Sequence, residues 1–255
     1  DKFSISYEDQ LDDFIDLAKK GLTKDVELLV GPETALIEGV WENNIEITHS
    51  VVILKELQKK YPKLNILVGA STYRLFDAGE VKSSTARQIR DSDVFYDAYN
   101  SAIFISSSGE VKIYHKTKLV PGAEKTPFPR LFDKLADIMI NLGGIKGSLG
   151  NTSTDHVFKI NNQVITPLIC YESIYGDLDY GASNLISVIT NDGWWKNTSG
   201  YKQHFSYARL RSVEQRKSVV RSANTGISGF IDHNGDVLEK SEWNERSVLQ
   251  ANVSL

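Results

Sequence analysis

The first stretch of the chain has the pattern of an amphipathic helix. Apolar side chains recur three or four residues apart between Tyr7 and Leu22, which aligns them on one helical face. Ser6 precedes this pattern, and Glu8 and Asp9 occupy the turn that follows it. A serine cap followed by acidic residues is typical of a helix start. The pattern therefore predicts a helix that begins at Ser6 and buries one face.

Short apolar runs, separated by turn residues, alternate with helical stretches along the rest of the chain. Strands are expected at residues 26–30, 66–70, 157–160, 164–170, 185–190, 219–223 and 227–232, with a hairpin near 106–109 joining two more strands between 95 and 113. Helices are expected at 49–60, 131–142 and 201–217. This alternation predicts an α/β fold with buried sheets. Because neither a long flexible linker nor a repeat interrupts it, residues 1–255 are expected to form one domain.

Composition and charge exclude several classes of protein. Lys and Arg number 29 against 33 Asp and Glu, a net charge of −4, so the basic surface that nucleic acids require is missing. One cysteine cannot form an internal disulfide or a multi-cysteine zinc site. The five histidines include no pair at metal-ligand spacing with a carboxylate, so no metal is expected. No run approaches the ~18 apolar residues that span a bilayer and no signal peptide opens the sequence, so the chain as given is expected to be soluble.

Three chemically reactive residues lie at or just beyond the ends of expected strands. Glu33 follows the strand at 26–30, Lys116 follows the second strand of the hairpin, and Cys170 ends the strand at 164–170. Strand ends are where α/β sheets assemble active sites. Each residue alone has an ordinary explanation, since a lone cysteine is most often a buried hydrophobe and a strand-end charge is usually solvated. Their combination is what favours catalysis.

Glutamate, lysine and cysteine together suffice for acyl transfer through a thioester. Cysteine attacks as the thiolate, which is a minor form at neutral pH. A nearby carboxylate can accept the thiol proton, and an ammonium group can stabilise the thiolate and then the oxyanion. This chemistry needs no metal or organic cofactor. A papain-like site would instead use histidine as the base, and His115 beside Lys116 is the best alternative of this kind.

Several short motifs occur in the order in which one enzyme family carries them. Gly-Pro-Glu-Thr-Ala surrounds Glu33, His-Lys-Thr-Lys-Leu-Val-Pro contains Lys116, and Ile-Cys-Tyr-Glu contains Cys170. These segments resemble the Glu, Lys and Cys motifs of the nitrilase, or carbon–nitrogen hydrolase, superfamily. Within it, the chain is most similar to the extramembrane catalytic domain of bacterial apolipoprotein N-acyltransferases. The closer similarity rests on Glu124 and on residues 190–195, 203–204, 208–211 and 221–228.

The resemblance implies a fold and roles for five residues. The implied fold is a nitrilase-like, four-layer α-β-β-α sandwich with mixed sheets. Cys170 would be the nucleophile, Glu33 the base and Lys116 the stabiliser of the oxyanion. Glu124 matches a carboxylate that orients the lysine and the substrate, and Glu172 matches a functionally important acid beside the nucleophile.

The resemblance also implies the reaction and its partners. An acyl chain would move from a membrane phospholipid to the cysteine, and then to the free amine of the diacylglyceryl-cysteine that begins a lipoprotein. The implied location is the bacterial inner membrane, with this domain on its periplasmic or extracytoplasmic face. Tyr171, Trp194 and Trp195 are candidates for contact with the substrate or the bilayer interface, although ordinary aromatic packing explains them as well.

The chain departs from this family in three places, and two other functions stay open. The membrane helices that precede the domain in the family are absent here, the strand expected ahead of the first helix is missing, and the segment between Glu172 and Asn184 is short. A soluble amidase or nitrilase would use the same three residues to hydrolyse a carbon–nitrogen bond. A catalytically inactive binding protein is the remaining alternative, and an unreactive Cys170 would favour it.

Overall fold

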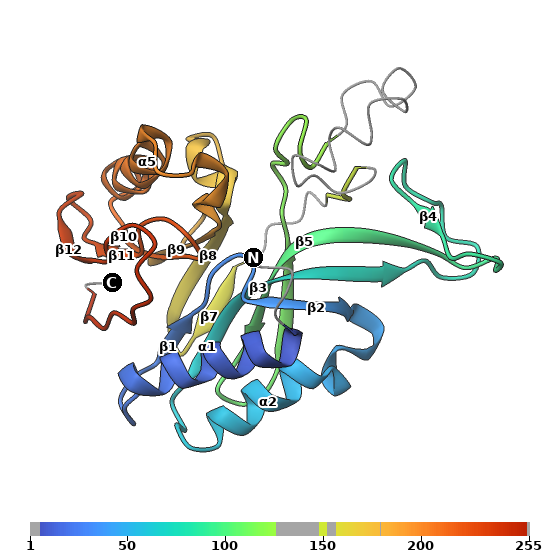
Figure 1. Ribbon diagram of the computed structural model, residues 1–255, viewed down its shortest axis with the longest axis horizontal. Helices are drawn as coiled ribbons and strands as arrows, with labels where there is room; N and C mark the ends of the chain where they lie inside the picture. Colours follow the sequence, from blue (N-terminus) through green and yellow to red (C-terminus); the bar gives the residue numbers. More distant parts are fainter. Residues whose placement is uncertain (1–5, 126–147, 152–156, 179, 254–255) are drawn as a thin grey trace.

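The structure of the protein is a computed structural model, and it describes residues 6–125, 148–151, 157–178 and 180–253. The predicted helix at 131–142 and the strand expected ahead of the first helix lie outside these residues. Within them, two mixed sheets of six strands each form the centre of the molecule. Three longer helices lie against the sheets (Figure 1).

The first sheet is built around two long, antiparallel strands. β3 (Asn65–Leu75) pairs with β5 (Phe95–Ile105), and β1 (Leu28–Val30) and β2 (Leu36–Trp41) both run parallel to β3. On the other side, β4 (Arg87–Gln88) and β6 (Val111–His115) pair antiparallel with β5. The far ends of β3 and β5 project from the body of the molecule as an arm (Figure 1).

The second sheet has a parallel centre. β8 (Gln163–Ile169), β9 (Leu185–Thr190) and β10 (Ser218–Ala223) are parallel to one another. The antiparallel strands β7 (Phe158–Ile160), β11 (Gly229–Ile231) and β12 (Val237–Lys240) complete it, in the order β12-β11-β10-β9-β8-β7. The carboxyl ends of β8, β9 and β10 therefore lie at one edge, where connecting segments can bring side chains together.

Three apolar clusters show how the layers stack. The helices α1 (Tyr7–Gly21) and α2 (His49–Gln58) cover the first sheet, and α5 (Ser199–Gln215) covers the second (Figure 1). Along β3, Ile66 and Val68 belong to the cluster under α1 and α2, whereas Leu67 belongs to the cluster between the sheets. This alternation follows from the two-residue period of a strand. A third cluster joins the second sheet to α5, so the predicted four-layer sandwich is confirmed.

The strands and helices predicted within the described residues are present, with different bounds. The helix behind Ser6 is confirmed, and the Ser6 side chain accepts a hydrogen bond from the Asp9 amide at 3.1 Å. The strand predicted at 66–70 continues to Leu75, because it remains paired with β5 along the arm. The strands β2, β4 and β12 were not predicted. No helix occupies the described part of residues 175–184.

No helix in the described ranges is both long and apolar enough to cross a membrane.

Candidate active site

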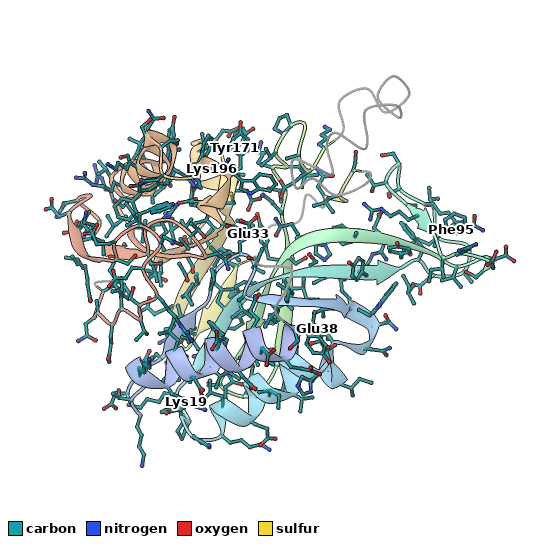
Figure 2. All side chains as sticks on the ribbon, in the orientation of Figure 1. Lys19, Glu33, Glu38, Phe95, Tyr171 and Lys196 are labelled. Carbon is teal, nitrogen blue, oxygen red and sulfur yellow. The ribbon has the colours of Figure 1, made fainter. Side chains whose placement is uncertain are left out.

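The two sheets bring Glu33, Lys116 and Cys170 to one place. Glu33 lies in the turn between β1 and β2, Lys116 directly follows β6, and Cys170 directly follows β8. Figure 2 shows Glu33 between the strands of the two sheets, whereas Phe95 lies out on the arm. The charges of Glu33 and Lys116 both act on the Cys170 thiol. The three residues predicted from the sequence therefore share one site.

Lys116 is buried between two carboxylates. Its Nζ lies 2.8 Å from Glu124 Oε1 and 3.5 Å from Glu33 Oε1, and the side chain is 1% exposed. Burial lowers the pKa of Lys116, but the nearby negative charges outweigh burial and leave this pKa above its usual value. The lysine is therefore a fixed positive charge, which is what an oxyanion would need.

Asn100 connects the two carboxylates and was not found from the sequence. Its Nδ2 donates to Glu33 Oε1 at 2.7 Å and to Glu124 Oε1 at 2.9 Å. Its main-chain oxygen accepts a hydrogen bond from the amide of Lys116 at 2.8 Å. An asparagine in the middle of a strand carries no sequence signal for such a role, because only the pairing of β5 with β6 brings it beside the lysine.

Cys170 has an unusual main chain and a protonated thiol. Its φ is +51°, in the left-handed region that residues with a Cβ rarely adopt. Burial raises the pKa of the thiol, and the charge of Glu33 raises it further, to about 12, although Lys116 and Thr190 oppose this shift. The resting group is therefore a thiol, and attack requires a base to take its proton.

Glu172 holds the cysteine loop to the lysine loop. Its Oε1 accepts hydrogen bonds from the Tyr114 hydroxyl and from the main chain and hydroxyl of Thr117, each at 2.7 Å. Its Oε2 accepts from the Ile169 amide at 2.8 Å, and the side chain is fully buried. Both oxygens are thus occupied by the protein itself, which suits a positioning role better than contact with a substrate.

The predicted aromatic residues lie at the same end of the second sheet as Cys170. Tyr171 follows the cysteine, and its ring packs edge-on against the ring of Tyr175, with the two centroids 5.4 Å apart. Trp194 and Trp195 end the turn after β9 and are 55% and 43% exposed. In Figure 2, Tyr171 and Lys196 lie together at this end. Contact of these rings with a substrate stays a prediction.

His115 is engaged away from the cysteine. Its Nε2 lies 2.6 Å from Glu42 Oε1, and its ring stacks on Tyr99 with centroids 3.8 Å apart. A side chain held in this way is a poor base for Cys170, so Glu33 is the better candidate.

Within the described residues, neither a metal site nor a cavity beside α1 accounts for this chemistry. No group of three or more potential ligands could hold a metal ion within the part of the chain that the structure describes. A cavity of about 870 Å³ lies between α1, β1, β10 and residues 244–253, but Glu33, Lys116 and Cys170 do not line it. The candidate chemistry therefore belongs to the charged site between the sheets.

Comparison with known proteins identifies the family. The model of the Carbon-nitrogen hydrolase family matches residues 8–255. This chain belongs to the carbon–nitrogen hydrolase family. A solved CN-hydrolase superfamily protein of Xanthomonas campestris has the same fold, with a TM-score of 0.57 at 12% identity over 92% of this chain and 81% of that one.

Two curated relatives of this chain share one name. An apolipoprotein N-acyltransferase of Chlorobaculum tepidum is 32% identical over 182 residues, which is 68% of this chain and 34% of the relative. An apolipoprotein N-acyltransferase of Aquifex aeolicus is 27% identical over 93% of this chain and 47% of the relative. The chain thus spans between a third and a half of the length of these two relatives.

Proposed function

We propose that residues 1–255 form one catalytic domain that transfers an acyl chain from a phospholipid to the N-terminal amine of a diacylglyceryl-cysteine lipoprotein. The observation that carries this proposal is the Lys116 ammonium, held between Glu33 and Glu124 and acting on the Cys170 thiol. The names of the curated relatives support an apolipoprotein amine as the acyl acceptor.

In the first step the acyl chain moves from the lipid to the enzyme. Glu33 accepts the proton of the Cys170 thiol as sulfur attacks the ester carbonyl of the phospholipid. The carbonyl oxygen gains negative charge, which the Lys116 ammonium stabilises. The ester C–O bond then breaks, and the proton on Glu33 passes to the leaving alkoxide. The products are a lysophospholipid and an acyl thioester on Cys170.

In the second step the acyl chain moves to the acceptor amine. The neutral amine attacks the thioester carbonyl, and Lys116 again stabilises the oxyanion. The C–S bond breaks, an amide forms, and the amine loses a proton, which returns to Cys170 through Glu33. Both steps transfer only an acyl group and protons, so neither requires an oxidant, a metal or an organic cofactor.

Other residues hold these groups in place and meet the membrane. Glu124 and Asn100 keep the Lys116 ammonium beside Glu33, and Glu172 fixes the turn after Cys170. Tyr171, Trp194 and Trp195 contact the acyl chain or the bilayer surface, where Trp and Tyr are favoured. The domain acts at the extracytoplasmic face of the bacterial inner membrane, and its net charge of −4 gives no reason to expect a nucleic-acid partner.

Intact-mass spectrometry tests the first step. Full-length protein is incubated with mixed micelles of diacyl phospholipid and detergent, and Cys170→Ala serves as the control. We expect the mass of one acyl chain on Cys170, and its loss when a diacylglyceryl-cysteine peptide is added. Peptide mapping locates the adduct, because this chain has one cysteine. If full-length protein gains no acyl chain under these conditions, the proposal is wrong.

A second candidate is an amidase that uses the same three residues. The family description favours it, since carbon–nitrogen hydrolases break such bonds. The thioester would then be hydrolysed by water instead of being captured by an amine. Release of ammonia from simple amides, at a rate unaffected by phospholipid, would support the amidase. Variants of Cys170 cannot separate the two functions, because both need the thioester.

A further inference from the structure

The main chain of Cys170 is held in its left-handed conformation by contacts with its carbonyl group. The Ser173 hydroxyl donates to the Cys170 oxygen at 2.8 Å, and Nε2 of His204 lies 3.1 Å from the same oxygen. A residue with a Cβ leaves this conformation unless its surroundings hold it there. The direction of the Cys170 side chain therefore depends on what fixes His204 and Ser173.

His204 is a buried residue of α5 that contacts the ion pair between Asp192 and Arg221. Its side chain is 3% exposed, and its Nδ1 lies 2.7 Å from Asp192 Oδ1. The other oxygen of Asp192 accepts a hydrogen bond from Arg221 Nη2 at 2.8 Å, and both side chains are fully buried. Asp192 after β9, His204 of α5 and Arg221 of β10 thus form one buried cluster, which reaches the Cys170 carbonyl through His204.

The Asp192 carboxylate is well prepared to orient this histidine. Burial disfavours its charged form, but the hydrogen bond with His204 and the charge of Arg221 outweigh burial and hold its pKa below the usual range. The Thr190 hydroxyl donates to Asp192 Oδ1 at 3.0 Å. A Cβ at residue 226 would lie 2.3 Å from Asp192 Oδ2, so only a glycine leaves room for the carboxylate there.

We propose that His204 is a positioning residue for the nucleophile. Held by Asp192, it donates a hydrogen bond from Nε2 to the Cys170 carbonyl and keeps the residue in the conformation that directs sulfur toward Glu33 and Lys116. A carbonyl oxygen and an ionised carboxylate can only accept, so the contacts with Cys170 and Asp192 together require a hydrogen on both ring nitrogens of His204. The inference rests on the proposed function only in naming Cys170 as the nucleophile.

Two substitutions of His204 separate this role from a merely structural one. His204→Gln places an amide near the position of Nε2 and can still donate to the Cys170 oxygen. His204→Asn places its amide near the position of Nδ1, so it can meet Asp192 but does not reach Cys170. Both remove the ring from the buried cluster, and they differ in the one contact that the proposal needs. His233→Asn, on the exposed side of a turn, is the control for loss of a histidine.

The measurement is the rate constant for alkylation of Cys170 by iodoacetamide, followed by intact mass, with thermal unfolding of each variant recorded alongside. This readout needs neither lipid nor lipoprotein, so it can fail or succeed independently of the acyltransferase proposal. A misdirected nucleophile loses about tenfold or more in rate. We expect that loss for His204→Asn, whereas His204→Gln and His233→Asn should stay within about threefold of the unchanged protein.

A crystal structure of His204→Asn provides the direct readout, since φ of Cys170 should leave the left-handed region. An unchanged φ together with an unchanged alkylation rate in the folded variant would overturn the proposal. If His204→Asn does not fold, His204→Gln carries the test alone. A folded His204→Gln that reacts as slowly as a misdirected thiol would overturn it equally. In acyl transfer, the expected signature of His204→Asn is a lower kcat with little change in KM.

Discussion

At the scale of residues, the proposed chemistry depends on the proton of the Cys170 thiol. The Cys170 thiol, the Glu33 carboxylate and the Lys116 ammonium act on one another in a buried site. The negative charge of Glu33 makes the thiolate harder to form, yet the same carboxylate is the proposed acceptor of the thiol proton. The two effects of Glu33 oppose each other, so they can be separated by experiment.

Glu33→Gln should make Cys170 more reactive toward iodoacetamide while abolishing acyl transfer. Removing the negative charge lowers the thiol pKa and increases the thiolate fraction at any pH below it. We expect an alkylation rate at pH 8 at least about threefold higher than in the unchanged protein, since one pKa unit is a tenfold change in thiolate. In the unchanged protein the rate should keep rising with pH beyond 10, because the thiol pKa is raised to about 12.

Glu124→Gln is the matched control, since Glu124 also contacts Lys116, while Glu33 is the carboxylate that raises the thiol pKa most. The control should change alkylation less than Glu33→Gln does. Slower alkylation in Glu33→Gln would mean that the carboxylate assists attack by the thiol more than its charge opposes formation of the thiolate, contrary to this prediction.

The sequence motifs located some residues of the site and missed others for a physical reason. Glu33, Lys116 and Cys170 each follow a strand, Cys170 is the one cysteine of the chain, and short motifs surround all three, so their positions were informative. Asn100 and His204 act through hydrogen bonds to other side chains, and their partners lie far away in the sequence. Roles of this kind emerge only when the strands and helices are placed in space.

At the scale of elements, the position of Glu33 depends on close packing of its turn against β3. Gly69 lies within β3, where a Cβ would come within 2.1 Å of the main-chain oxygen of Glu33. The Gly69 amide also donates to the Pro32 oxygen at 3.0 Å. A main chain cannot move aside as a flexible side chain can, so any larger residue at 69 must displace the turn that carries Glu33.

Gly69→Ala should therefore impair both folding and activity. We expect a loss of at least about 2 kcal/mol in the free energy of unfolding, typical of an overpacked core, together with a fall in kcat. Gly39→Ala is the control in the same sheet, because its Cβ would meet the Tyr73 ring, a side chain that can shift. Denaturant unfolding and acyl-transfer assays measure both effects. Equal losses in the two variants would show that the turn at Glu33 tolerates the strain.

Strands with a clear apolar run were predicted from the sequence, and strands without one were missed. Each strand of the second sheet's parallel centre contains a short apolar run, and the three strands were predicted. β2 contains Glu38 and Gly39, β4 has two residues, and β12 is largely exposed. Such strands form because a neighbouring strand offers hydrogen bonds, and their own sequence carries little of that information.

At the scale of the whole molecule, the site depends on how the two sheets are held together. The proposed base Glu33 and the Lys116 ammonium come from the first sheet, and the proposed nucleophile Cys170 comes from the second. Besides the apolar cluster between the sheets, a polar contact joins them beside the base. The Thr34 amide and hydroxyl both donate to Asn224 Oδ1, at 2.9 Å and 2.7 Å. Asn224 directly follows β10, and its main-chain N–H donates a hydrogen bond to the main-chain oxygen of Thr190 at 3.0 Å.

Asn224→Ala tests whether this contact sets the distance between base and nucleophile. The variant removes the acceptor that Thr34 uses, which should cost about 1–2 kcal/mol in the free energy of unfolding. Because Thr34 adjoins Glu33, the turn should shift away from the second sheet, and kcat should fall about tenfold or more while KM changes little. Asn184→Ala is the matched control: Asn184 Oδ1 accepts from the Val164 amide at 2.9 Å, a contact within the second sheet.

The two asparagine variants are comparable, because each loses a side-chain oxygen that accepts a hydrogen bond from a main-chain N–H. Similar losses of stability are expected in both, measured by denaturant unfolding. A contact that only stabilises the fold would lower kcat to the same small extent in each variant. A contact that aligns the sheets for catalysis lowers kcat in Asn224→Ala alone. The site is assembled from residues on two separate sheets, so its activity should respond to the link between them more steeply than its stability does.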